Sequence, residues 1–130
     1  MILLDTDVCI EIIRGNKFVI EKRKIEEESV SISFMTASEL YYGALKSERP
    51  EKNISIIDEF ILTLSVIQSN NSIIRKYAEL KSQLEYTGQS LADADLFIAA
   101  TTLVKCSKLI TGNIKHYKRI DELRIENWIR

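Results

Sequence analysis

Acidic residues at separated points of the chain are the side chains best suited to chemistry. Asp5 and Asp7 follow the apolar run Ile2–Leu4, Glu39 lies in an apolar and aromatic segment, and Asp95 lies in a segment that is apolar nearly all round. An ionised carboxylate without a partner is costly among apolar side chains, and several carboxylates in one pocket repel one another. A divalent cation removes both costs, and Mg²⁺ or Mn²⁺ prefers oxygen ligands.

Some of these acids also have a structural interpretation. Asp5 is a good N-cap for the helix that follows it, and taken alone that role is favoured. Ser90–Asp93 resembles a capping box, which predicts that Asp93 is the third residue of a helix. Residues two apart on a helix point about 200° away from each other, so Asp93 and Asp95 cannot both face one point. We expect Asp95 to be the ligand, because alanines on its side of the helix leave room for a partner.

Polar and basic residues follow an apolar run near the C-terminal end. Thr111 ends this run, and Asn113 and the only histidine, His116, come soon after it. A turn explains the asparagine equally well, and a lone histidine is more often structural or exposed than catalytic. The basic and aromatic run 115–119 suits phosphate contact, although a solvated loop explains it as well. The candidate phosphate contacts are Lys115 from this run and Arg14 near the first acid.

The elements that would position these residues alternate along the chain. Short apolar or alternating runs predict strands, and amphipathic segments between them predict helices. The predicted strands cover residues 2–4, 30–34, 64–67, 108–111 and 124–129. A charged helix is predicted over 17–28, and Thr36 or Ser38 would cap the helix that follows the second strand. Strands that alternate with helices indicate an α/β fold with a mostly parallel sheet of four to five strands. Ligands bind beyond the carboxyl ends of such strands, which is where Asp5 would lie.

The length and composition of the chain restrict the classes of protein to which it can belong. The chain has 130 residues, which predicts a single domain over 1–130. A net charge of -1 excludes a global field that would draw the protein onto nucleic acid or a membrane, but not a local basic patch. No apolar run is long enough to span a membrane. The two cysteines lack motif spacing, so we expect reduced thiols in a cytoplasmic protein.

Four segments together make the chain resemble a PIN-domain ribonuclease, specifically the VapC toxin of VapBC toxin–antitoxin systems. The matching segments are Leu4–Asp7, Thr36–Leu40 with Gly43 after it, Asp95–Ala100 and Leu109–Asn113. Each segment is a weak signal alone, but their order and spacing match the family over nearly the whole chain. The resemblance implies a three-layer α/β/α fold.

The resemblance also implies an activity and a set of site residues. Mg²⁺ or Mn²⁺ would be held by Asp5, Glu39 and Asp95, and RNA phosphodiester bonds would be hydrolysed with the help of the metal. Family members often carry another acid after the fourth strand, where this chain has asparagine and histidine instead. Either the metal shell is lighter on that side, or Asp93 contributes to it. Further candidates for the site are Thr6, Thr111, Asn113 and His116.

The partners implied are an RNA substrate, a small VapB-like antitoxin that blocks the site, and a second copy of the chain. Apolar and aromatic residues of the early helices would form the antitoxin surface, although they are equally good core residues. They are Ile10, Ile13, Tyr41 and Tyr42.

Two other classes of function remain open. Asp5 and Asp7 after an apolar strand also resemble the start of haloacid-dehalogenase-like phosphatases, in which the first aspartate is the nucleophile. That motif requires threonine or valine where Cys9 stands, and a lysine and an acid pair that are not convincingly placed here. A non-catalytic partner-binding module is the other alternative, but an inactive PIN protein would have lost one of the three acids.

Overall fold

A five-stranded parallel sheet forms the centre of the computed structural model, which describes residues 1–130. Its strand order is β3-β2-β1-β4-β5, and every neighbouring pair is parallel. The strands are β1 (Ile2–Leu4), β2 (Val30–Ser33), β3 (Ser65–Ile67), β4 (Leu109–Ile110) and β5 (Ile125–Glu126). All five predicted strands are confirmed, and four of them are shorter than the apolar runs that predicted them.

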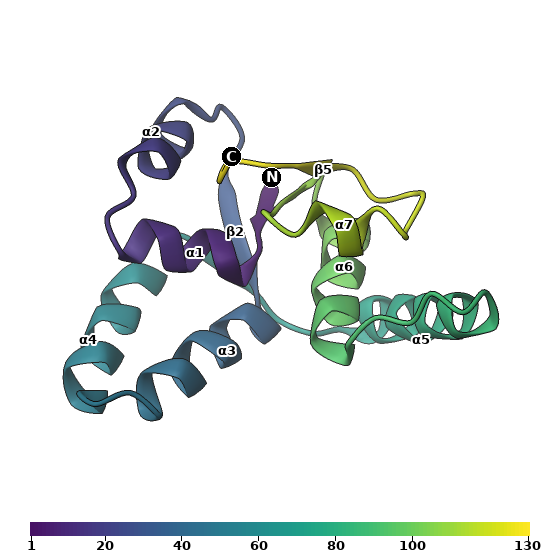
Figure 1. Ribbon diagram of the computed structural model, residues 1–130, viewed down its shortest axis with the longest axis horizontal. Coiled ribbons are helices and arrows are strands. Elements are labelled where there is room, and N and C mark those ends of the chain that lie inside the picture. The colour runs from purple at the N-terminus through teal and green to yellow at the C-terminus, as the bar shows by residue number, and fades with distance from the viewer.

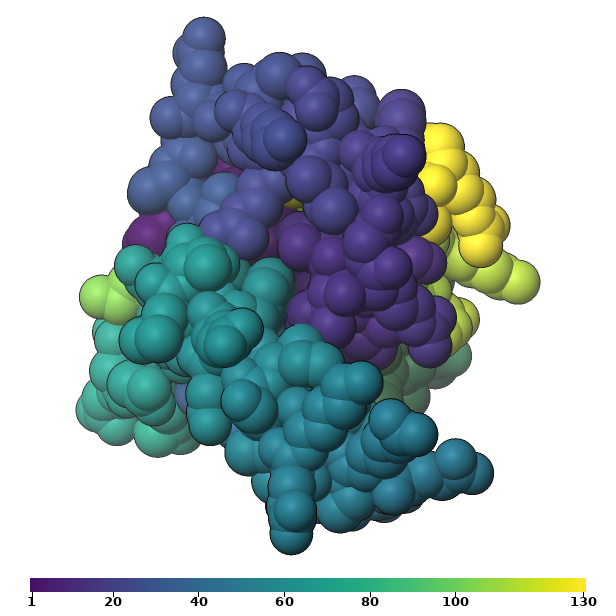
Figure 2. Space-filling model, turned by 90° about the vertical axis from the view of Figure 1, so that its left-hand side faces the viewer, coloured from purple at the N-terminus to yellow at the C-terminus, as the bar shows by residue number.

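Helices cover both faces of the sheet and produce the expected three layers. Figure 1 shows α1 to α4 on one side of the strands and α5 to α7 on the other, and Figure 2 looks onto the side with α1, α2 and α4. The helices are α1 (Thr6–Ile13), α2 (Lys17–Ile25), α3 (Phe34–Leu45), α4 (Pro50–Ile61), α5 (Asn71–Tyr86), α6 (Asp93–Lys105) and α7 (Ile114–Tyr117).

The central strand β1 shows why the core has two halves. Successive strand residues point to opposite faces, so Ile2 and Leu4 pack under α1 to α4, whereas Leu3 packs under α5 to α7. All three side chains are fully buried. Each contributes about 1.5–3 kcal/mol relative to an exposed position. This burial fixes β1 in the middle of the sheet, and with it the position of the acid that follows.

Three local predictions are wrong. The N-cap of α3 is Ser33, whose hydroxyl accepts the Thr36 N–H at 3.1 Å, so neither Thr36 nor Ser38 caps this helix. The charged helix predicted over 17–28 ends at Ile25, and two of its apolar residues, Phe18 and Ile25, are exposed.

The predicted capping box before α6 is also wrong. The helix begins at Asp93, and its N-cap, Ala92, makes no side-chain hydrogen bond. Asp93 is therefore the first helical residue rather than the third. The reason lies in a tertiary contact, because the Asp93 carboxylate pairs with Lys81 of α5 instead of reaching the backbone at the helix start.

Two further expectations concern the environment of the protein. None of the seven helices combines the length and apolar character that crossing a bilayer requires. Cys9 is buried and Cys106 is partly buried, and both are free thiols. Burial raises the pKa of the Cys9 thiol well above its ordinary range, so this sulfur is an apolar packing group of the core.

Candidate active site

The carboxyl ends of β1, β2 and β4 meet at one edge of the sheet, and the site is built there. The chain runs from β1 outward to β2 and β3, and then crosses to the other side of β1 to form β4 and β5. Such a reversal of strand order leaves a crevice at the carboxyl edge, where α/β proteins bind ligands.

Asp5 occupies the centre of this edge and is only 6% exposed. Its Oδ2 accepts the Thr111 hydroxyl at 2.7 Å, and its Oδ1 accepts the Thr6 N–H at 2.8 Å. The second bond confirms that Asp5 is the N-cap of α1, so the structural and functional interpretations of this residue are compatible. Burial raises the pKa of Asp5 from its ordinary value of 3.8 to about 7, and the charges of Asp7 and Asp95 raise it too.

Glu39 joins the site through Thr6. The Thr6 hydroxyl, in the first turn of α1, donates to Glu39 Oε1 at 2.8 Å and lies 3.0 Å from the hydroxyl of Thr36. Both Glu39 and Thr36 belong to α3, which begins directly after β2. Thr6 therefore bridges the ends of two neighbouring strands, since its backbone contacts Asp5 and its side chain contacts Glu39.

Asp95 reaches the site from the other layer of helices. It is the third residue of α6 and is partly exposed. The hydroxyl of Tyr117, from α7, donates to Asp95 Oδ1 at 3.3 Å and lies 3.5 Å from Asp5 Oδ1. Two acids that are 90 positions apart in the sequence thus contact the same hydroxyl group.

Asp7 is a fourth acid at this edge, and our sequence analysis assigned it no site role. Its Oδ2 accepts the Gly112 N–H at 2.9 Å, and its Oδ1 accepts the Val8 N–H at 2.8 Å. Burial raises its pKa above the ordinary value, and the charge of Asp95 acts in the same direction. Asp7 therefore connects the first turn of α1 to the loop after β4.

No cation in the chain neutralises these carboxylates. All the ion pairs of the protein lie elsewhere, and none includes Asp5, Asp7, Glu39 or Asp95. No three acidic, histidine or cysteine side chains form a ready-made metal-binding group. However, Mg²⁺ commonly uses one or two protein carboxylates and completes its shell with water and phosphate oxygens. The donor set at this edge fits such an ion.

The other predicted residues divide between the edge and its surroundings. Thr111 contacts Asp5, as described above. Asn113 and His116 bond to each other, with 2.8 Å between Nδ2 and Nδ1, and neither side chain contacts an acid. Both residues lie beside the site, in the segment after β4, but their side chains stabilise the local turn by bonding to each other.

Asp93 points away from the site. Its Oδ1 accepts from the Tyr77 hydroxyl at 2.8 Å and from Lys81 Nζ at 2.9 Å, so its charge is already compensated. Arg14 is exposed and lines an open hollow together with Asp7 and Asn113. Lys115 is exposed on α7 and makes no hydrogen bond or ion pair.

Tyr117 and Thr36 also contact residues of the site, although neither was a predicted site residue. In the sequence, Tyr117 is only one member of a basic and aromatic run. The residues next to it in the sequence do not indicate that its side chain is fully buried. Thr36 was interpreted as a helix cap. A signal existed only for Asp7, because an acid three residues after a strand end still lies near the carboxyl edge of the sheet.

Comparisons with known proteins identify the family of this fold. The PIN domain family model matches residues 2–123. Ribonuclease VapC2 of Haemophilus influenzae is 31% identical over 128 residues, which cover 98% of this chain and 97% of the relative. The tRNA(fMet)-specific endonuclease VapC of Shigella flexneri is 28% identical, and the match covers 97% of this chain and 96% of the relative. A similar fold occurs in the crystal structure of VapBC2 from Rickettsia felis bound to a DNA fragment from its promoter. The matching chain has a TM-score of 0.92 and is 32% identical, and the match covers 98% of this chain and 99% of that chain. The chain belongs to the PIN-domain family, among the VapC ribonucleases.

Proposed function

We propose that this protein is a metal-dependent endoribonuclease and the toxin of a type II toxin–antitoxin pair. One observation carries the proposal. Asp5, Glu39 and Asp95 come from three separate segments, reach one edge of the sheet and have no cationic partner there. The names of the VapC relatives support RNA as the substrate.

The residues that would hold the metal are Asp5 and Asp95, with Glu39 as a third ligand or as the group that orients the attacking water. Mg²⁺ or Mn²⁺, when bound, would polarise a phosphate oxygen and lower the pKa of a bound water. Thr111 keeps the Asp5 carboxylate in place, and Thr6 does the same for Glu39. These hydroxyl groups fix the rotamers of the ligands, as residues that hydrogen-bond to metal ligands commonly do.

The protein also offers contacts for the rest of the RNA. Arg14 stands at the end of α1 beside the hollow that Asp7 and Asn113 line. A guanidinium group there would bind the phosphate next to the scissile one, since bidentate pairing with phosphate is a strength of arginine. Lys115 on α7 would add a second positive charge. Neutral substitutions at these two positions would weaken RNA binding more than the chemical step.

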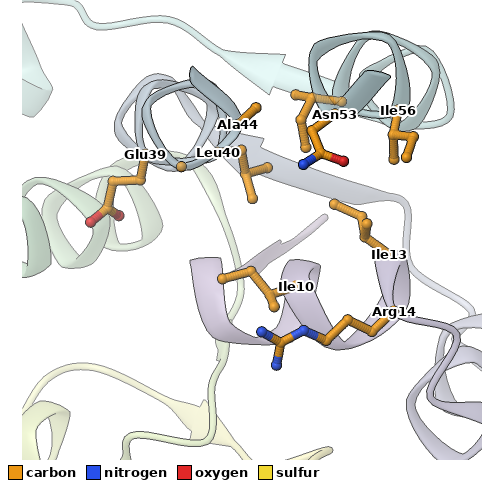
Figure 3. Close-up of a pocket in the computed structure, with 10 residues that line it drawn as sticks. Ile10, Ile13, Arg14, Glu39, Leu40, Ala44, Asn53 and Ile56 are labelled. Carbon is orange, nitrogen blue, oxygen red and sulfur yellow. The ribbon is translucent and has the colours of Figure 1, made fainter. Parts of the chain in front are cut away.

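An antitoxin fits a groove between α1, α3 and α4. Figure 3 shows the apolar side chains of these helices facing one another, with Glu39 at one end of the groove. Ile10 and Ile13 line this groove, whereas Tyr41 bonds to Asp58 and Tyr42 lies outside the groove on the exposed surface. An apolar antitoxin segment that ends in arginine would cover the groove and neutralise Glu39.

The same resemblance leads us to propose a homodimer. Tyr42 and Leu45 of α3 are 64% and 61% exposed, which is unusual for large apolar side chains. Light scattering on the purified toxin measures this directly. A monomeric mass at micromolar concentration would contradict the proposal without affecting the nuclease assignment.

The phosphatase alternative is not favoured. The haloacid-dehalogenase motif requires threonine or valine where Cys9 stands, and this position is a fully buried thiol of the apolar core. The PIN family match over residues 2–123 points away from the phosphatase class as well.

The decisive experiment compares two aspartates of the same helix. Purified wild type, Asp95→Asn and Asp93→Asn proteins are incubated with total RNA and initiator tRNA, with Mg²⁺ or with EDTA, and the cut ends are sequenced. We expect Mg²⁺-dependent cleavage by wild type and by Asp93→Asn, because Asp93 lies outside the site. Asp95→Asn should lose at least 100-fold in rate, which corresponds to about 2.7 kcal/mol of transition-state stabilisation. Undiminished cleavage by Asp95→Asn would refute the assignment.

A further inference from the structure

Tyr117 holds a polar group at the point where the two proposed metal ligands approach each other. Its ring is fully buried in the apolar cluster under α5 to α7, which also contains Leu3 and Leu109. Only its hydroxyl reaches the acid cluster, 3.3 Å from Asp95 Oδ1 and 3.5 Å from Asp5 Oδ1. The rigid ring thus places a single hydrogen-bond donor between two carboxylates.

The two carboxylates depend on this hydroxyl to different degrees. Asp5 has two shorter hydrogen bonds, from Thr6 and Thr111, which fix its orientation without help. The Tyr117 hydroxyl is the only side-chain partner of the Asp95 carboxylate. A hydroxyl has one proton to donate, and the shorter contact directs it to Asp95.

A tyrosine hydroxyl is a neutral donor. Its contact with the two acids therefore adds no positive charge that would compete with a cation.

We propose that Tyr117 is a positioning residue, which orients the Asp95 carboxylate toward Asp5 so that the two acids can share one divalent cation. The inference rests on the proposed metal-dependent function and assigns a role to a residue that contacts no substrate. A donor behind a carboxylate fixes the direction of its free lone pairs, and loss of such a partner commonly weakens metal affinity 10–100-fold.

The test is Tyr117→Phe, which keeps the buried ring and removes only the oxygen. Mn²⁺ and Mg²⁺ binding are measured by calorimetry in the absence of RNA, and cleavage is measured over a range of Mg²⁺ concentrations. We expect the dissociation constant of the metal to rise about 10- to 100-fold. The Mg²⁺ concentration for half-maximal cleavage should rise by the same factor, whereas the rate at saturating Mg²⁺ should fall much less.

Tyr77→Phe is the matched control. Its hydroxyl also donates to an aspartate, Asp93, at 2.8 Å, but this pair lies outside the site. We expect unchanged metal affinity in this variant. Equal weakening in both variants would show that any lost tyrosine hydroxyl perturbs α6, and it would overturn the proposal.

A double variant tests whether Tyr117 acts through Asp95. In an Asp95→Asn background, adding Tyr117→Phe should change the metal affinity by less than twofold, because the oriented ligand is already gone. A full further loss would place the effect elsewhere and overturn the proposal.

The calorimetry also separates this inference from the function on which it rests. If wild type binds neither ion, both the metal dependence and the role of Tyr117 are wrong. If wild type and Tyr117→Phe bind the ion equally, the metal site stands and only the positioning role is wrong.

Discussion

The buried carboxylate of Asp5 makes the stability of the metal-free protein depend on pH in a direction opposite to that of an ion-paired aspartate. Its pKa in the folded protein is about 7, against 3.8 ordinarily. The folded protein therefore keeps a proton that the unfolded chain loses, and stability is highest below pH 4 and falls as pH rises toward 7. The full shift corresponds to about 4 kcal/mol, of which about 3 kcal/mol is lost between pH 5 and pH 8.

Asp5→Asn removes this dependence. Urea unfolding of wild type and variant in EDTA, at several pH values from 5 to 8, gives the free energy of unfolding for each. The variant should gain about 3 kcal/mol relative to wild type over this range. Asp93→Asn is the control, and its curve should run parallel to wild type, because Asp93 is exposed and paired with Lys81. Parallel curves for Asp5→Asn and wild type would refute the argument that burial and like charges strain this site.

Addition of Mg²⁺ completes the test. An ion that binds only the folded state stabilises it by about 2.7 kcal/mol at a concentration 100 times its dissociation constant. Wild type at pH 8 should therefore recover much of the stability that ionisation of Asp5 removes, whereas Asp5→Asn should gain little. Equal stabilisation of both proteins would show that Asp5 is not a ligand.

Two further substitutions test the supports of the site. Thr111→Val should destabilise the protein by about 1.5–3 kcal/mol at pH 8 and by less at pH 5, because the lost bond is strongest when Asp5 is ionised; urea unfolding at the two pH values measures this. Gly112→Ala should cost about 1–3 kcal/mol, since the new Cβ would lie 2.7 Å from Ile129 Cδ1 and 2.9 Å from Asp7 Oδ2. Thermal unfolding measures that loss, and an unchanged melting temperature would mean that the loop moves freely.

Much of the fold could be predicted from the sequence because its signals are local. An apolar run of three residues that ends in acids identifies β1, and the order of strands and helices restricts the sheet to a parallel one. Local signals failed where tertiary contacts compete with them. The capping box at the start of α6 does not form, since Lys81 on a neighbouring helix attracts Asp93.

The position of Asp5, Glu39 and Asp95 at one edge of the sheet was also predictable, but only through topology and family resemblance. The groups between the acids were not predictable, because hydrogen bonds across a sheet leave no periodicity in the sequence. Thr6 contacts an acid 33 positions away. Nothing in the residues around it distinguishes this threonine from the many that only begin helices.

These bridging hydroxyls decide what kind of metal site the chain can form. Thr6, Thr111 and Tyr117 each donate to a carboxylate, and none of them carries a charge that would compete with a cation. An arginine or lysine in any of these positions would also stabilise the acids, but it would neutralise the negative potential that attracts the ion. Neutral donors fix the direction of the carboxylates and leave their charge uncompensated. The strain on Asp5 is therefore a consequence of how the site is built, and a metal ion or the positive side chain of a partner would relieve it.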